Sequence, residues 1–350
     1  MKFILIFPFL DLDDHFNLRL VCKEALEEGR QKMAWRKHLK LVEIPVFNGI
    51  QYLERLTISM DEEYFNKLQI MTSLKELNLV KCGNITNYGL KYLQDIPINK
   101  LQLRDIDPYD KNLITIRDSN QITDDGLNLI KDTPINYLDL KLCNKITNNG
   151  LLHIKNSSIT HLSLWFNNIT NLGLIYLLEM KSLTHLNLHN YNITDEGLFI
   201  IRNLQLKKLS LCINITDEGL SYIKNMPLQT LKIYNIYDVE LFELQNINPE
   251  NINLHNITWR GFKHIKEIKL LTYLELYLDL DIEILSCIKE IKTLTHLNLG
   301  CPRDTLPSIG LVYLKELPLL KRLSLAECAY ISSEDVFMME KILPNCKIED

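Results

Sequence analysis

Cysteine and histidine are the side chains of this chain with the widest chemical repertoire, because thiolates and imidazoles serve as metal ligands, nucleophiles and general bases. The eight cysteines are scattered, without a C-x-x-C pair and without a histidine at metal-ligand spacing. They are Cys22, Cys82, Cys143, Cys212, Cys287, Cys301, Cys328 and Cys346. This distribution favours reduced, buried thiols in a cytoplasmic or nuclear protein over a zinc site or a disulfide framework. We expect no metal ion and no other cofactor.

Three of the nine histidines, His161, His185 and His296, occupy the same place in three similar segments, which favours a repeated structural position over a catalytic base. The chain has no phosphate-binding G-x-x-x-x-G-K-[ST] loop, no G-x-S-x-G elbow, no H-E-x-x-H motif and no dinucleotide fingerprint. No pairing of a nucleophile with a base is identifiable. We therefore predict that the chain has no catalytic residues and is not an enzyme.

The composition is that of a folded soluble protein, with 46% hydrophobic and 24% charged residues in a chain of 350. The formal net charge is −5, which argues against a nucleic-acid partner because such binders carry a basic face. The apolar run 3–10 is too short to span a bilayer and is followed by acidic residues instead of an A-x-A cleavage site. We expect no membrane partner.

The elements that position these residues come from an internal repeat, the pattern L-x-x-L-x-L, which recurs twelve times and ends in a half-copy at 343–348. The copies lie at 53–58, 74–79, 98–103, 135–140, 159–164, 183–188, 206–211, 228–233, 249–254, 271–276, 294–299 and 320–325. One long interval carries an insertion after Leu103, which we expect to form a surface loop. Apolar residues at this spacing predict short strands that stack into a parallel sheet over one continuous core.

A second motif, I-T-[DN]-x-G-L with small variations, follows many of the strands. It lies at 85–90, 122–127, 146–151, 169–174, 193–198, 215–220 and 257–262. The isoleucine is predicted to enter the core and the threonine to cap a helix, and an acidic residue beside it suits the positive end of that helix. Each repeat should therefore consist of a strand, a turn and a capped outer helix.

The two linked motifs resemble the cysteine-containing type of leucine-rich repeat over residues 50–350. Cys82, Cys143 and Cys328 occupy the cysteine position of that repeat, and Asn167 replaces it in another copy. The resemblance implies an α/β solenoid, a horseshoe with a parallel inner sheet and outer helices, built from about twelve repeats plus the terminal half-repeat.

Residues 1–45 carry no repeat, and their apolar spacing suggests two or three short amphipathic helices. This segment resembles an F-box, the helical module that binds the Skp-type adaptor of cullin–RING ubiquitin ligases. The matching residues, which the resemblance places on the adaptor-binding face, are Ile6, Phe7, Leu10, Val21, Cys22, Lys23 and Trp35. The alternative is that these helices only cap the open end of the solenoid.

The inner face of the predicted horseshoe is the expected binding surface for a target protein, because side chains at offsets 2, 4 and 6 of each copy, and at offset 7 just beyond the strand, point away from the core. Aromatic and histidine side chains gather there in the central copies, as is typical of binding hot spots. They are Tyr137, His161, Trp165, Phe166, His185, His189, Tyr234 and Tyr277. Alternatively, Trp165 and Phe166 pack against each other in a shortened turn.

The resemblance to F-box/leucine-rich-repeat proteins implies a substrate-receptor subunit of an SCF-type ubiquitin ligase, with a Skp-type adaptor, a cullin and an unidentified target protein as partners. The alternative is a cytosolic leucine-rich-repeat scaffold without a role in ubiquitin transfer. The two hypotheses differ in whether Phe7 and Leu10 are exposed to an adaptor or buried against the first repeat.

Overall fold

The structure is a computed structural model that describes most of the chain from residue 55 onward. The described residues are 18–20, 55–58, 65–66, 68–69, 71–80, 85–104, 121–141, 143–165, 167–190, 192–212, 214–234, 257–278, 280–301, 308–328 and 331–349. They fall into two compact units. The amino-terminal unit comprises Met1–Asn168 and Glu179–Ser182, and the carboxy-terminal unit comprises Ile169–Leu178 and Leu183–Asp350.

The amino-terminal unit is a sheet whose strands follow the order of the sequence. Its described strands are β1 (Leu18–Leu20), β2 (Arg55–Ile58), β3 (Glu76–Val80), β4 (Lys100–Arg104), β5 (Tyr137–Asp139) and β6 (His161–Ser163). Its described α-helices are α2 (Asn87–Lys91), α3 (Asp124–Ile130) and α4 (Asn148–Ile154). The strands from β2 to β6 are parallel, as the repeat pattern predicted.

The carboxy-terminal unit repeats the same arrangement, and all its described strands are parallel. The strands are β7 (His185–Leu188), β8 (Lys208–Cys212), β9 (Thr230–Tyr234), β10 (Tyr273–Tyr277), β11 (His296–Cys301), β12 (Arg322–Cys328) and β13 (Lys347–Glu349). The helices are η5 (Asn171–Glu179), α5 (Asp195–Ile201), α6 (Asp217–Ile223), α7 (Trp259–Ile265), α8 (Ile282–Ile288), α9 (Ser308–Leu311), η9 (Val312–Glu316) and α10 (Ser333–Ile342). Of the described helices, none is long and apolar enough to cross a bilayer.

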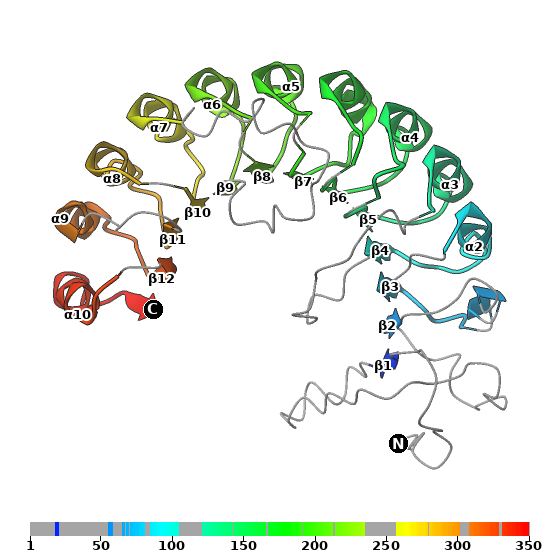
Figure 1. Cartoon of the computed structure of the whole chain (residues 1–350), viewed down its shortest axis with the longest axis horizontal. Coiled ribbons are helices and arrows are strands. Elements are labelled where there is room, and N and C mark those ends of the chain that lie inside the picture. The colour runs from blue at the N-terminus through cyan, green and yellow to red at the C-terminus, as the bar shows by residue number, and fades with distance from the viewer. Residues whose placement is uncertain are drawn as a thin grey trace, which may run out of the picture. The chain divides into compact units, whose positions relative to one another are not determined.

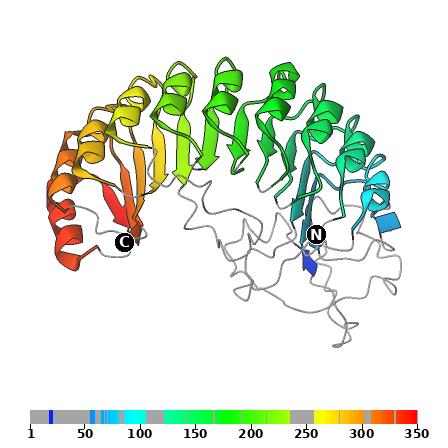
Figure 2. The ribbon, with the colours of Figure 1, turned by 45° about the horizontal axis from the view of Figure 1, so that its top comes forward.

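Among the described residues, the helices lie on one side of each sheet and no described helix covers the other side. Figure 1 shows α5 to α10 as a layer along the strands of the carboxy-terminal unit, and Figure 2 shows these strands running side by side. We call the uncovered side of each sheet the strand face. The fold is the leucine-rich-repeat solenoid that the sequence predicted, with strand, turn and outer helix in each repeat.

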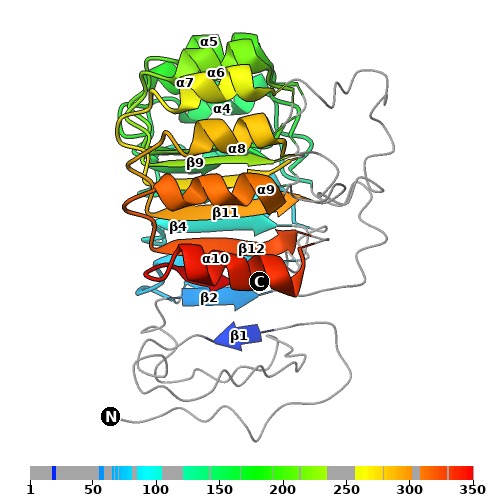
Figure 3. The same ribbon diagram turned by 90° about the vertical axis from the view of Figure 1, so that its left-hand side faces the viewer.

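The amino-terminal segment contributes one described element, and it is a strand. Residues Leu18–Leu20 form β1, which pairs antiparallel with β2 so that Leu18 lies opposite Ile58. Figure 3 shows the two arrows pointing in opposite directions. Short helices were expected in residues 1–45, and at Leu18–Leu20 that expectation is wrong. The physical reason is the outer edge of β2, whose backbone groups would otherwise lack a partner strand. The rest of the F-box-like segment lies outside the described residues.

No strand lies between β9 and β10 in the sheet, although the ninth copy of the strand pattern, at 249–254, was expected there. β9 pairs directly with β10, from Thr230 opposite Tyr273 to Tyr234 opposite Tyr277. The expectation of a separate repeat at 249–254 is therefore wrong. The repeat that begins with β9 instead carries its extra residues between its strand and its helix, the place at which the repeat of β4 also carries its insertion.

The core is built from the apolar positions of the two motifs. In the repeat that contains β8 and α6, the motif side chains are at most 1% exposed. They are Leu206, Leu209, Leu211, Ile215, Leu220 and Ile223. Truncating one such leucine to alanine removes packed methyl groups and leaves a cavity, at a cost of about 2–5 kcal/mol.

The cysteine position of the repeat holds a buried hydrogen-bond donor. The thiol of Cys328 donates to the Leu299 carbonyl of the preceding repeat at 3.1 Å. In another repeat, the Asn167 amide donates to the Leu140 carbonyl at 2.8 Å. Asparagine can replace cysteine here because both side chains are compact and can donate to the carbonyl of the preceding strand.

In several repeats, the Asp or Asn that follows the capping threonine connects the repeat to the next. The Asp124 carboxylate accepts from the Thr147 backbone N–H at 2.8 Å and from its hydroxyl at 2.6 Å. The Asp195 carboxylate binds Thr216 in the same way, at 2.8 and 2.5 Å. The residue expected only to complement its own helix dipole therefore also holds the helix start of the following repeat.

Asparagine and aspartate at this position have different consequences for the next helix. The Asn87 amide donates to the Thr123 hydroxyl oxygen at 2.7 Å, and Thr123 makes no side-chain capping bond. With Asp124 in that place, the Thr147 hydroxyl donates to the carboxylate, and its oxygen accepts from Asn149 N of α4. Only the carboxylate leaves the threonine oxygen available to cap its helix.

The glycine of the second motif is required by this connection. A Cβ at Gly150 would lie 2.7 Å from Asp124 Oδ1 and 2.9 Å from Leu127 Cδ1. At Gly126 it would lie 2.5 Å from Asn87 Oδ1. These distances are shorter than ordinary van der Waals contact, so any larger residue would push the linking side chain away from its threonine.

Candidate functional site

The candidate site lies on the strand face of the carboxy-terminal unit, where β9 and β10 run side by side. Burial alternates along both strands, with the leucine and isoleucine side chains buried and the residues between them partly exposed. The register places Lys232 opposite Glu275 and Tyr234 opposite Tyr277. The same alternation that builds the core therefore arranges these polar side chains in neighbouring pairs.

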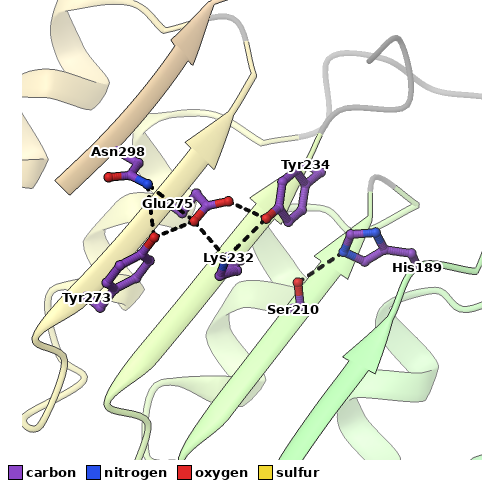
Figure 4. Close-up of polar contacts among 7 residues, drawn as sticks. All are labelled: His189, Ser210, Lys232, Tyr234, Tyr273, Glu275 and Asn298. Atoms are coloured by element: carbon purple, nitrogen blue, oxygen red, sulfur yellow. Dashed lines mark hydrogen bonds and ion pairs between the residues drawn. The ribbon is translucent and has the colours of Figure 1, made fainter. Parts of the chain in front are cut away.

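Glu275 is the centre of a hydrogen-bonded cluster on this face, drawn in Figure 4. Its carboxylate accepts from Lys232 Nζ at 2.8 Å, from the Tyr273 hydroxyl at 2.6 Å and from the Tyr234 hydroxyl. Asn298 on β11 donates to the Tyr273 oxygen at 2.9 Å. Three neighbouring strands thus supply one network, which we call the Glu275 cluster: Lys232, Tyr234, Tyr273, Glu275 and Asn298.

The cluster fixes the protonation of its members. Burial alone would raise the pKa of Glu275, but the hydrogen bonds from Lys232, Tyr234 and Tyr273 outweigh it, so that this pKa is lowered. Burial and the hydrogen bond to Glu275 raise the pKa of both tyrosine hydroxyls. The carboxylate is therefore ionised at neutral pH and both phenols are protonated.

Aromatic rings extend from the cluster along the sheet. The Tyr273 ring stacks on His296, with the centroids 5.9 Å apart, and the Tyr234 ring meets His189 at 4.8 Å. The Glu275 side chain is only 18% exposed, so the carboxylate lies beneath the surface that these rings form. The arrangement can hold planar side chains in fixed orientations, which suits recognition of another molecule.

Two of the predicted target-binding histidines, His189 and His185, differ in how far they are exposed. His189 is only 3% exposed, and its Nε2 lies 3.0 Å from the Ser210 hydroxyl. The expectation that His189 faces a partner is wrong, because the ring is packed beneath Tyr234 and supports it. His185 is partly exposed, and its Nδ1 lies 2.8 Å from Thr184 Oγ1.

The predicted residues of the amino-terminal unit form a second group on its strand face. Tyr137 stacks on His161 with the centroids 5.5 Å apart, and the Lys100 ammonium lies 4.7 Å from the Tyr137 ring. Trp165 is partly buried beneath Lys141, whose ammonium lies 3.6 Å from the indole centroid. Cation–π contact therefore holds the indole in place.

The remaining predicted site residues divide between the described and the undescribed parts of the chain. Tyr277 is partly exposed beside Tyr234 on the strand face. Phe166 lies outside the described residues, and so do all the predicted adaptor-binding residues. The latter are Ile6, Phe7, Leu10, Val21, Cys22, Lys23 and Trp35.

The sequence alone did not single out the Glu275 cluster, although Tyr234 was predicted. Lys232 and Glu275 both occupy outward positions, but the apparent copy at 249–254 separates them in the sequence pattern. Once β9 and β10 are neighbours, opposite charges at matching offsets indicate the ion pair. Asn298 occupies an outward position, and nothing else in the sequence indicated that it belongs to the cluster.

The polar groups of the Glu275 cluster are bonded to one another. The hydrogen bonds of both tyrosine hydroxyls are directed at Glu275, whose carboxylate is held as an ion by Lys232. Within the part of the chain that the structure describes, no group of three or more His, Cys, Asp or Glu side chains is placed to hold a metal ion. What the cluster provides chemically is a rigid surface with aromatic rings and a partly exposed ammonium.

Comparisons with known proteins agree with the repeat architecture. A family model described as "Leucine Rich repeat" matches residues 71–93 and 155–178. A search of curated proteins gave no match. A crystal structure of the yeast Rad7 and Elc1 complex contains a similar chain, with 17% identity and a TM-score of 0.53, over 82% of this chain and 72% of that one.

Two bacterial structures are also similar to the chain. A leucine-rich-repeat protein of Leptospira interrogans has 17% identity and a TM-score of 0.28, over 86% of this chain and 94% of that one. An internalin of Listeria monocytogenes has 16% identity and a TM-score of 0.40, over 83% and 94%. At these identities, the comparisons concern the fold alone.

Proposed function

We propose that this chain is a non-catalytic protein-binding receptor whose strand face holds a target protein, and that it is the substrate-receptor subunit of an SCF-type ubiquitin ligase. The observation that carries the binding function is the Glu275 cluster. Rings held by hydrogen bonds lose little conformational freedom when a partner binds, so less of the interaction energy is spent on ordering them.

The ligase assignment rests on the amino-terminal segment. Its F-box-like residues, among them Phe7 and Leu10, would bind a Skp-type adaptor and through it a cullin. The chain would then raise the effective concentration of the target near the charged conjugating enzyme, without supplying a catalytic group itself. Such a subunit would work in the cytoplasm or nucleus. The yeast Rad7 and Elc1 structure supports this proposal to the extent that a similar fold occurs in a protein complex.

The pairing of β1 with β2 favours a second candidate, a leucine-rich-repeat scaffold whose amino-terminal segment only covers the edge of the first repeat. Leu18 to Leu20 satisfy the backbone of β2, as a cap would. The two candidates share the strand-face binding site and differ only in whether an adaptor binds.

Co-expression with a Skp-type adaptor and a cullin, followed by a pull-down, tests the ligase assignment. The double variant Phe7→Ala/Leu10→Asp should lose the adaptor, whereas Tyr273→Ala, on the strand face, should keep it. Recovery of adaptor by the wild type and by Tyr273→Ala alone supports the receptor. If a folded wild type recovers no adaptor, the scaffold replaces the receptor as the better description.

A further inference from the structure

One row of side chains runs across the whole strand face of the carboxy-terminal unit and carries only positive charge. It consists of the first outward residue of each strand, and the register of every neighbouring pair aligns them. From β7 to β13 the row reads His185, Lys208, Thr230, Tyr273, His296, Arg322 and Lys347. It contains three basic residues and two histidines, but no Asp or Glu.

The charge of the row is only partly neutralised by its surroundings. Among the described residues, no carboxylate lies within ion-pair distance of Lys208, which is exposed. Arg322 and Lys347 share Glu349, at 3.0 and 2.6 Å. Of the residues that the structure describes, the three positive charges of the row and that one negative charge leave +2, on a chain whose net charge is −5. Glu275 in the next row is already paired with Lys232 and does not offset this excess.

His296 presents one nitrogen of its ring to a partner. The Thr295 hydroxyl donates to the Thr272 carbonyl at 3.0 Å, so its oxygen accepts from His296 Nδ1 at 2.9 Å. That bond fixes Nδ1 as the protonated nitrogen and leaves Nε2 for other contacts. Within the described part of the chain Nε2 has no partner.

We propose that this row binds an extended acidic segment of the target protein, lying across the strands. The inference rests on the proposed function, because it names the chemistry of the partner for the same face. Neighbouring strands are about 4.8 Å apart, so Lys208 and Arg322, four strands apart, are separated by about 19 Å. An extended chain advances about 3.3 Å per residue and covers this distance in about six residues. Tyr273, between the two charges, would contact an apolar side chain of the segment.

Selection from a random twelve-residue peptide library, panned against the full chain at low salt, tests the proposal. We expect enrichment of peptides with acidic residues about six positions apart and an apolar residue between them. In fluorescence anisotropy with the best synthetic peptide, Lys208→Glu combined with Arg322→Glu should weaken binding about tenfold, since each variant reverses a contact charge. Lys315→Glu, the same charge change at an exposed position of η9, should leave the dissociation constant unchanged.

Melting temperatures of the variants show that they remain folded, and Lys208→Glu alone provides a second variant away from Glu349. The proposal is overturned if no peptide is enriched, if the enriched peptides carry no excess of Asp or Glu, or if the charge reversals leave binding unchanged. Peptides without acidic residues that lose affinity on Tyr273→Ala would contradict the acidic partner while leaving the strand face as the binding site. The adaptor pull-down is independent of all these results.

Discussion

Replacing Asp124 by asparagine tests the connection between repeats, because the substitution exchanges one carboxylate oxygen for an NH₂ group. The carboxylate accepts both from the backbone N–H and from the hydroxyl of Thr147, at 2.8 and 2.6 Å. An amide keeps the first bond through its oxygen, but its NH₂ group then faces the threonine oxygen as a donor. The Thr147 oxygen becomes an acceptor for that amide, as Thr123 is for Asn87, and the cap bond from Asn149 N is lost.

The expected cost follows from the two bonds that change. Replacing a hydrogen bond to a carboxylate by one between neutral groups loses about 1 kcal/mol, from about 1.5–3 to about 0.5–1.5. The cap bond contributes about 0.5–1 kcal/mol, at the low end of the usual range because Asn149 N and Thr147 Oγ1 are 3.3 Å apart. Through these two bonds, Asp124→Asn should therefore lower the free energy of unfolding by about 1.5–2 kcal/mol, in addition to the loss of its helix-dipole contribution.

Asp125 provides the matched control. It is the next residue of α3, it is exposed, and it carries the same charge near the same positive helix end. Asp125→Asn removes a similar helix-dipole contribution, about 0.3–1 kcal/mol, without touching Thr147. The difference between the two variants therefore isolates the bonds to the next repeat.

Urea unfolding and amide hydrogen exchange measure the two parts of this effect. Asp124→Asn should unfold at a lower urea concentration than Asp125→Asn, and the Asn149 amide should exchange faster only in Asp124→Asn. Equal midpoints for the two variants, together with unchanged protection of Asn149, would show that the carboxylate does not hold the following repeat.

Two further substitutions test other contacts, one beside Asp124 and one in the Glu275 cluster. Gly150→Ala places a Cβ 2.7 Å from Asp124 Oδ1 and should cost about 1–3 kcal/mol in urea unfolding, whereas Asn149→Ala, exposed on the same helix, should be close to neutral; similar midpoints would contradict the close packing. Burial and the Glu275 carboxylate raise the pKa of Tyr234, and Glu275→Gln removes the negative charge, so more phenol should ionise near pH 11 in a spectrophotometric titration than in the wild type; superimposable titrations would refute the contribution of that charge.

The pKa shifts of Glu275 and Tyr234 determine how the stability of the fold changes with pH. The pKa of Glu275 is lowered by folding, so its contribution is complete above the unfolded value of about 4.3 and is lost as the pH falls through the lower, folded value. The pKa of Tyr234 is raised by folding, so its contribution is complete below about pH 10 and is lost as the pH rises through the folded value. Between these limits the cluster keeps one protonation state.

The sequence predicted the repeat because its strongest signals are local. Leu206, Leu209 and Leu211 indicate a strand by spacing alone, and the structure buries all three. The connection from Asp124 to Thr147 could not be read in this way, because the two residues lie 23 positions apart and meet only when the repeats are stacked. From the motif we predicted only that the aspartate interacts with the dipole of its own helix. That interaction is weaker than the hydrogen bonds that the same carboxylate makes to Thr147.

The site was harder to predict because its partners come from different strands. The pattern at 249–254 is a plausible strand by apolar spacing, and it placed Lys232 and Glu275 in repeats that are not neighbours. Offset alone also placed His189 on the surface, whereas the ring of Tyr234 covers it. The position in the repeat predicts on which face of the sheet a side chain lies. It does not predict whether a large ring from a nearby strand buries that side chain.

The Glu275 cluster links three strands that the apolar core already holds together, and this bears on why the cluster is there. The apolar core and the bonds such as that between Asp124 and Thr147 connect the repeats on the helix side. Burying Lys232 and Glu275 costs desolvation that their attraction does not necessarily return, so stability alone is a weak reason for the ion pair. Its distinct effect is to fix Tyr234 and Tyr273 in one orientation. The ion pair makes this surface rigid but costs desolvation of two charges. Recognition of a partner explains such a surface better than folding does.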